Sequence, residues 1–197
     1  MNQSAAGLEN DPRWRRLHDR PWLCTSCGLT HHGIFDIAYG KPAAWPGSGE
    51  PSPNSILTTS THFLSEDFCV VEDQHHFVRC MLELPIQGTD SERFGFGVWS
   101  SLSKSNFALY AETFDDMEQG ALGPWFGWFS NRLQGYADTF GLKCQVHPRS
   151  GGQRPFIELE STEHPLARDQ REGITLQRLL EIYAAHGHDL RSVLSDA

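Results

Sequence analysis

The sequence predicts an α+β protein with a mainly antiparallel sheet and flanking helices. Strand-like segments with alternating apolar and polar residues dominate its middle, and helical segments are interspersed among them. The two kinds of segment do not alternate regularly, as they would in a parallel β-α-β protein. A length of 197 residues with 39% hydrophobic residues is enough for one domain with its own core.

The chain divides into three parts by composition. Residues 1–21 are polar, hold no apolar stretch of the signal-peptide kind, and predict a flexible arm. A single α+β domain is expected over residues 22–187, and residues 188–197 are expected to form a C-terminal tail. Residues 40–55 contain four prolines and three glycines, which is typical of a loop.

The clearest strand pattern lies at residues 76–84. Its apolar side chains recur at every second position, which predicts a half-buried strand with one face formed by Val78, Cys80, Leu82 and Leu84. Glycines at 95 and 97 in a second strand, residues 94–102, indicate that a neighbouring segment packs closely there. Further strands are expected at residues 68–72, 125–133, 141–148 and 155–161.

Three helices follow from capping residues and apolar spacing. Ser103 can cap a helix that ends near Phe114, and Thr162 can cap a short helix toward Glu172. Thr175 can cap a last helix, which ends at a glycine and whose buried stripe is expected to be Leu176, Leu179, Leu180 and Tyr183.

The charge is acidic and unevenly distributed. The chain has 25 acidic and 16 basic residues, a net charge of −9, and residues 50–120 alone carry twelve acidic and three basic residues. Such a balance disfavours binding to nucleic acids and anionic membranes, because both need clustered positive charge. An acidic face could instead bind a basic protein partner. No apolar run of about 18 residues is present, so no transmembrane helix is expected.

The chain contains five cysteines, namely Cys24, Cys27, Cys69, Cys80 and Cys144. An odd number of cysteines without a secretory signal fits a reducing compartment better than a disulfide framework. We therefore expect a cytoplasmic protein whose thiols are packing residues, metal ligands or redox groups.

The sharpest motif is Cys24-x-x-Cys27-Gly28, with His31 four residues after the second cysteine. Two thiolates at this spacing can bind one zinc ion from a tight turn, and the glycine lets the backbone fold around the metal. A tetrahedral site needs two more ligands, which His31 or His32 and a distant cysteine, Cys69 or Cys80, could provide. The same motif could also be a redox pair or a pair of ordinary thiols.

The remaining cysteines are weaker candidates. Cys80 shares the apolar face of its strand, which favours a packing role, and Cys69 lies among apolar neighbours and is ambiguous. Cys144 and His147 are three positions apart in an expected strand, so they face opposite sides and are unsuited to share a metal.

The ordered series of motifs resembles a bacterial family, Domain of Unknown Function 2199. The resemblance rests on Cys24-x-x-Cys27-Gly28-x-x-His31-x-Gly33 and on later segments at 35–39, 66–71, 76–86, 96–103, 126–140 and 152–174. It covers roughly residues 22–185 and implies one intact domain without an assigned activity. It also implies that Cys69 joins Cys24, Cys27 and His31, which makes these four residues the expected metal ligands.

The function that these observations favour is a small cytosolic binding or accessory protein with a structural zinc ion. An immunity-type or inhibitor protein that uses an acidic face is the first alternative, and a zinc-dependent hydrolase is the second. No catalytic residue is predicted, because the sequence contains no G-x-S-x-G, H-E-x-x-H or phosphate-loop motif.

Overall fold

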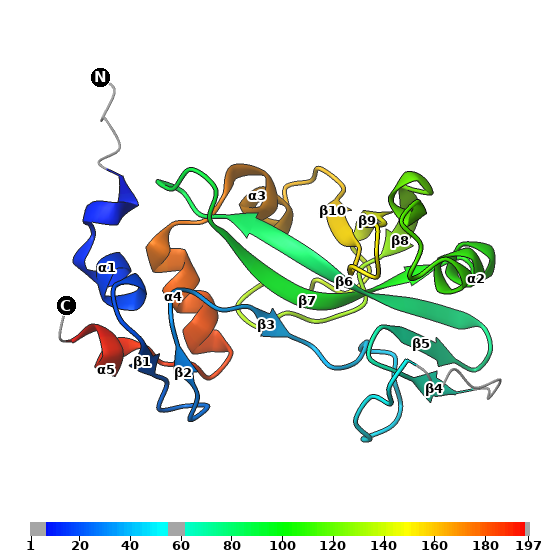
Figure 1. The fold of residues 1–197 in the computed structure, drawn as a ribbon, viewed down its shortest axis with the longest axis horizontal. Coiled ribbons are helices and arrows are strands. Elements are labelled where there is room, and N and C mark those ends of the chain that lie inside the picture. Colours follow the sequence, from blue (N-terminus) through cyan, green and yellow to red (C-terminus); the bar gives the residue numbers. More distant parts are fainter. Residues whose placement is uncertain (1–6, 55–61, 196–197) are drawn as a thin grey trace.

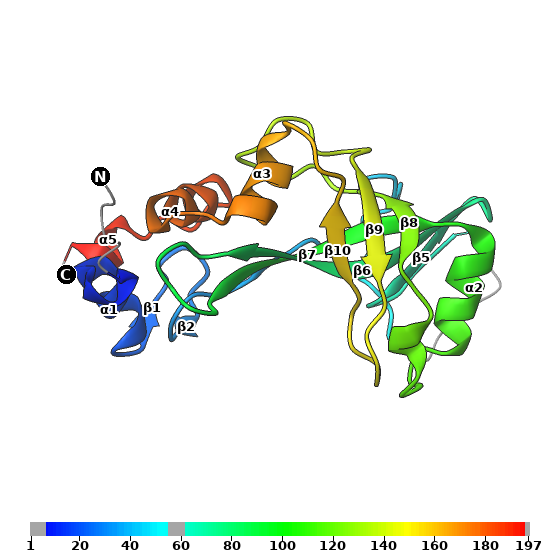
Figure 2. The same ribbon diagram turned by 90° about the horizontal axis from the view of Figure 1, so that it is seen from above.

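The computed structural model describes residues 7–54 and 62–195. In these residues a twisted sheet is flanked by helices, so the predicted α+β class is confirmed. Figures 1 and 2 show an elongated molecule in which two long strands run through the middle and helices lie at both ends.

These two strands, β6 (His75–Pro85) and β7 (Arg93–Leu102), form an antiparallel hairpin. Their bounds agree closely with the predicted strands, because a buried residue stands at every second position of β6 and fixes its face. Cys80, Leu82 and Leu84 have no exposed surface, which confirms the predicted apolar face.

The glycines of β7 admit a parallel neighbour. Strand β3 (Ile37–Ala38) pairs with β7 in parallel and brings Asp36 alongside. A Cβ atom on Gly95 would stand 2.8 Å from the Asp36 carboxyl, and the Gly95 N–H donates to that carboxyl at 2.8 Å. The expected close packing at residues 95 and 97 is thus confirmed.

The sheet is mixed, which corrects the prediction of a mainly antiparallel one. Its strands lie in the order β3-β7-β6-β10-β9-β8, and β5 and β4 extend it beside β6. Both β3 against β7 and β10 against β6 are parallel pairings, and each joins a short strand to a long strand far away in the chain. The remaining strands of this sheet are β4 (Phe63–Leu64), β5 (Phe68–Val71), β8 (Trp125–Trp128), β9 (Lys143–His147) and β10 (Phe156–Leu159).

The sheet curls so that the end of β8 reaches β7. Ser130 N–H donates to the Trp99 carbonyl at 2.8 Å, and Phe129 forms an isolated bridge with Ser100. The Asn131 side chain accepts a hydrogen bond from Trp99 N–H at 2.7 Å and donates to the Lys41 carbonyl at 2.9 Å. This buried amide therefore ties the predicted loop at residues 40–55 to the curled sheet.

Three helices flank the sheet. Helix α2 (Lys104–Glu112) is capped by Ser103, and α4 (Leu176–Ala185) by Thr175, both as predicted. Helix α3 (Pro165–Glu172) is capped by His164 instead of the expected Thr162, because His164 Nδ1 accepts from Leu166 N–H. Two 3₁₀ turns lie at Leu8–Asn10 and Gln119–Ala121. Within the described residues, no helix has both the length and the apolar character needed to cross a membrane.

The end of the molecule opposite α2 contains both described chain ends (Figure 1). Helix α1 (Pro12–His18) lies in the predicted arm, yet its Trp14 and Leu17 side chains are buried in the core. Helix α5 (Arg191–Leu194) lies in the predicted tail and buries Val193. Both segments thus pack against the domain where they are described, while residues 1–6 and 196–197 lie outside the described residues. The domain boundaries themselves stay predictions.

The acidic residues of the middle segment do not gather in one place. Glu72 and Asp73 lie in the turn before β6, whereas Asp90 and Glu92 lie in the turn after it. An eleven-residue strand is roughly 35 Å long, so these two acidic turns are far apart. A basic partner for an acidic face stays a prediction.

Candidate metal centre

The Cys24-x-x-Cys27 motif forms a tight loop between two short strands. Strands β1 (Trp22–Leu23) and β2 (Thr30–His31) pair in antiparallel fashion. Within the loop, Gly28 N–H donates to the Cys24 carbonyl at 2.8 Å, and Gly28 has φ +73°, which a residue with a side chain rarely adopts. The predicted turn around the two thiols is therefore present.

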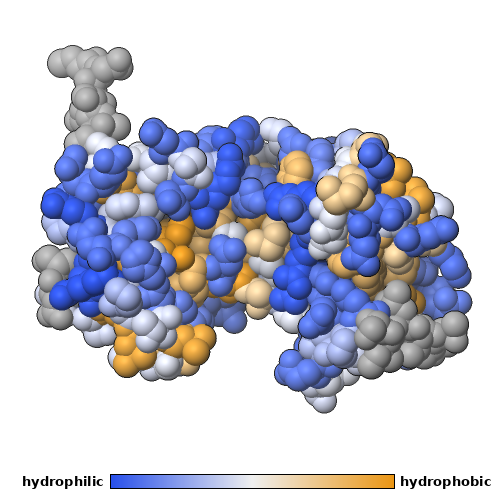
Figure 3. Space-filling view, viewed as in Figure 1, coloured by the Kyte–Doolittle hydropathy of each residue, from blue (hydrophilic) through white to orange (hydrophobic). Residues whose placement is uncertain are grey.

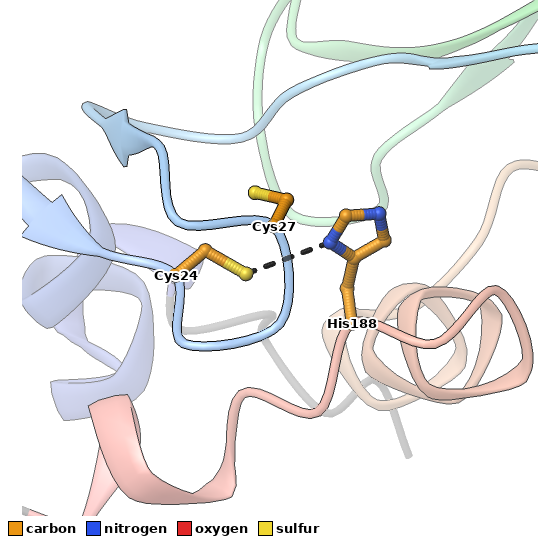
Figure 4. Close-up of side chains that lie close together, drawn as sticks. All are labelled: Cys24, Cys27 and His188. Atoms are coloured by element: carbon orange, nitrogen blue, oxygen red, sulfur yellow. Dashed lines mark hydrogen bonds between the residues drawn. The ribbon is translucent and has the colours of Figure 1, made fainter.

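A third candidate ligand comes from the other end of the chain. Gly187 ends α4 with φ +83°, and the next residue, His188, then points toward the cysteine loop (Figure 4). Its Nδ1 atom lies 3.5 Å from Cys24 Sγ. One ligand atom each from Cys24, Cys27 and His188 lies within 4.8 Å of the others, a group that could hold a metal ion.

His31 stands beside this group. Its Nε2 atom lies 3.3 Å from Cys27 Sγ, and its ring stacks on Phe35 with 4.2 Å between ring centroids. Burial, together with the nearby His188, lowers the pKa of His31. The neutral imidazole that this environment favours is the form that binds metals.

The environment of Cys24 favours its thiolate. Burial raises the pKa of the Cys24 thiol, whereas the hydrogen bond from His188 lowers it. The backbone N–H groups of Ser26 and Cys27 lower it further, and the net result is a pKa of about 7 instead of 9.0. A substantial fraction of Cys24 is then ionised at neutral pH, and the thiolate is the form that binds metals.

Of the four predicted ligands, the structure brings three together and leaves one apart. Cys24, Cys27 and His31 lie at the β1–β2 end, whereas Cys69 lies in β5 near the other end (Figure 1). Cys69 is fully buried in a small cluster with Leu64, Val71, Phe77 and Trp99, and burial raises its pKa to about 12. Cys69 thus lies apart from the other three predicted ligands, in surroundings typical of a packing residue.

The two remaining cysteines, of which Cys80 was the alternative distant ligand, are also apart from this group. Cys80 and Cys144 are buried in the main core, and burial raises the pKa of both thiols, that of Cys144 to about 11. The residue that sequence reasoning missed is His188, because residues 188–197 were expected to be a tail. The signal that could have found it is the sequence His186-Gly187-His188, which places a histidine directly after a helix-ending glycine.

An open pocket of about 460 Å³ borders the metal group. Cys27, His31 and His188 line one part of it, and Asp36 and Tyr39 line another. Figure 3 shows an apolar patch over the β1–β2 end of the molecule, where Leu23 and Leu29 are 57% and 62% exposed. The candidate centre thus lies at the surface, beside a pocket and exposed apolar side chains.

The fold and this group define a small α+β protein with a candidate metal centre where its N-terminal and C-terminal segments meet. The chain belongs to the family described as uncharacterized protein conserved in bacteria (DUF2199), which matches residues 23–174 and confirms the resemblance. The matched part contains Cys24, Cys27 and His31 but ends before His188. None of the curated proteins and none of the solved structures matches this chain.

Proposed function

We propose that this chain is a small cytosolic binding or accessory protein with a structural zinc ion held by Cys24, Cys27, His188 and His31. One observation carries the proposal. Cys24 and His188 are 164 residues apart in the sequence, yet their ligand atoms and that of Cys27 lie within 4.8 Å of one another. Zinc binds two thiolates and two imidazoles in many structural sites.

A structural role follows from the number and origin of these ligands. Structural zinc sites are closed by four protein ligands, and His31 is available as the fourth because of its contact with Cys27. Zinc bound there would join the β1–β2 loop to the segment between α4 and α5. Free thiols in all five cysteines are compatible with the reducing cytosol.

Metal analysis of protein purified without added metal tests this proposal. We expect about one zinc per wild-type chain, and loss of most of it in Cys24→Ser and in His188→Ala. Cys69→Ser is the matched control, since it also changes a buried thiol and should retain the zinc. Wild-type protein without bound metal would contradict the proposal, and so would a Cys69→Ser protein that loses its zinc while His188→Ala keeps it.

A zinc hydrolase is the second candidate, and the pocket beside Cys27, His31 and His188 favours it. A hydrolase needs three protein ligands and an open position for water. Cobalt-substituted protein distinguishes the two candidates, because added azide changes the visible absorption bands only when a coordination position is open. We expect no change for the wild type and a change for His31→Ala.

A further inference from the structure

A second cavity, of about 470 Å³, is lined by none of the residues of the candidate metal centre. Residues of β6, β7, β10, α3 and the loop after β9 line it. Its charged side chains are three arginines and two carboxylates, a local balance of +1 in a chain with a net charge of −9. These five residues are Glu83, Arg93, Arg149, Glu158 and Arg171.

Arg149 is held in place by its neighbours. Its Nη2 atom donates to Glu83 at 2.6 Å, and its guanidinium carbon lies 5.1 Å from the centroid of the Phe156 ring. His147 stacks on the same ring at 4.4 Å with an interplanar angle of 6°. A guanidinium fixed by a carboxylate and by an aromatic ring loses little conformational freedom when it binds a ligand.

The arginines retain donors for a ligand. Glu83 is shared, since Arg93 Nε lies 4.0 Å from its second oxygen. A guanidinium has five N–H donors, and among the described residues Arg149 uses only its contact with Glu83. Arg171, from α3, lines the same cavity and donates to Ser161 and Glu172.

The wall of the cavity also has an apolar part. Phe156 is half-buried and Ala167 is buried, and both line the cavity beside the arginines. Guanidinium groups recognise phosphates and carboxylates through paired hydrogen bonds, and apolar walls bind the rest of a small ligand. We propose that this cavity binds a small molecule with a phosphate or carboxylate group next to an aromatic or apolar body.

Arg132 provides a matched control, because it has the same kinds of partner, a carboxylate and an aromatic ring, but does not line this cavity. It pairs with Asp138 and lies 5.0 Å from the Phe140 ring, as Arg149 pairs with Glu83 and lies over Phe156. Its side chain is 61% exposed, whereas that of Arg149 is 31% exposed. A difference between the two arginines therefore reports on the cavity and not on an arginine over an aromatic ring.

Calorimetric titration with phenyl phosphate and with benzoate, at low ionic strength, tests the proposal. We expect saturable binding of at least one probe to the wild type, and a loss of tenfold or more in affinity for Arg149→Gln, since a charged hydrogen bond is removed. Binding of one probe alone identifies phosphate or carboxylate as the recognised group. Arg132→Gln should bind like the wild type.

Arg93→Gln is a second variant, because its side chain is 55% exposed and its substitution should not disturb folding. It should also weaken binding, and thermal melts of each variant will show whether the fold is intact. Absence of saturable binding of either probe to the wild type would overturn the proposal. An equal loss in Arg132→Gln and Arg149→Gln would overturn it as well. Neither outcome depends on whether the chain binds zinc.

Discussion

The two cysteines of the β1–β2 loop and the three cysteines of the sheet show how one residue type acquires two roles. Cys24 has no exposed surface, like Cys69, yet its pKa is lowered to about 7 while that of Cys69 is raised to about 12. The difference lies in the donors around each sulfur. His188 and backbone N–H groups face Cys24, whereas burial is the one cause that acts on Cys69.

Burial alone therefore does not identify a packing thiol. A thiolate without donors in an apolar cluster is strongly disfavoured, so Cys69 stays protonated. A thiol that faces an imidazole and backbone N–H groups can ionise even when water does not reach it. The partners of a cysteine thus distinguish a candidate ligand from a core residue.

The largest expected effect is the loss of folding stability when zinc is removed. This loss should depend on the cysteines of the β1–β2 loop and not on those of the sheet. At a free zinc concentration 1,000-fold above its dissociation constant, binding to the folded state adds about 4 kcal/mol to the free energy of unfolding. We expect urea denaturation with and without a chelator to reveal this increment in the wild type and not in Cys24→Ala.

Cys69→Ala is the control for this experiment. It should lower the free energy of unfolding by about 1 kcal/mol with or without zinc, because it removes a small buried side chain. A zinc increment that disappears in Cys69→Ala would contradict the packing role of Cys69.

The rate of thiol alkylation should show the next largest difference between the cysteines of the β1–β2 loop and those of the sheet. Cys27 is exposed, whereas Cys69, Cys80 and Cys144 are buried and have raised pKa values. In metal-free protein, iodoacetamide should modify Cys27 roughly a hundredfold or more faster than the three sheet cysteines, which react only after local opening.

Mass spectrometry of the intact protein over time measures this reaction. Cys27→Ser should lose the fast phase, and added zinc should slow it in the wild type. Fast modification of Cys69 in the native protein would contradict the packing role that its burial assigns to it.

Much of the sheet could be predicted because its pattern is local. The long strands β6 and β7 carry their own alternation and turn signals, so their bounds were found within about one residue. Strand β3 was missed, because it has only two residues and no alternation of its own, and β10 was predicted as a strand but not its parallel pairing with β6. Whether a short strand joins the sheet in parallel depends on contacts far apart in the sequence.

The candidate metal centre was predictable to the same limited extent. Spacing places Cys24, Cys27 and His31 in one turn, and the structure agrees. His188 follows the helix-ending glycine that the sequence does indicate, but the packing of α4 that brings it to the cysteines is encoded by no local pattern. Cys69 was chosen from the resemblance, and its own segment, β5, is buried on all four residues and holds it elsewhere.

Asp36 provides the test with the smallest expected effect. Its carboxyl is affected both by burial, as Cys69 is, and by a backbone N–H donor, as Cys24 is. Burial raises its pKa, the Gly95 N–H lowers it, and Glu83 raises it further, so the net shift is upward. In the pH range just above the ordinary value of 3.8, the folded protein then binds more protons than the unfolded chain. Stability should therefore fall as the pH rises through the raised pKa of Asp36, and its carboxylate should destabilise the fold at neutral pH.

Asp36→Asn should consequently be more stable than the wild type at pH 7, since the amide oxygen can still accept from Gly95 N–H at the position that Asp36 Oδ1 occupies. The gain in stability should shrink as the pH falls and vanish well below 3.8, where the wild-type carboxyl is also neutral.

Asp67→Asn is the matched control, and its stability at pH 7 should change in the opposite direction. Asp67 forms an ion pair with Arg154 at 2.5 Å, so this variant should be less stable than the wild type. Urea denaturation of both variants across pH 3 to 8 measures the effect. A loss of stability in Asp36→Asn at pH 7 would mean that the single hydrogen bond from Gly95 N–H stabilises the buried carboxylate more than burial destabilises it. One donor would then be enough to ionise a buried group, and Cys24 would not need all of its donors to form a thiolate.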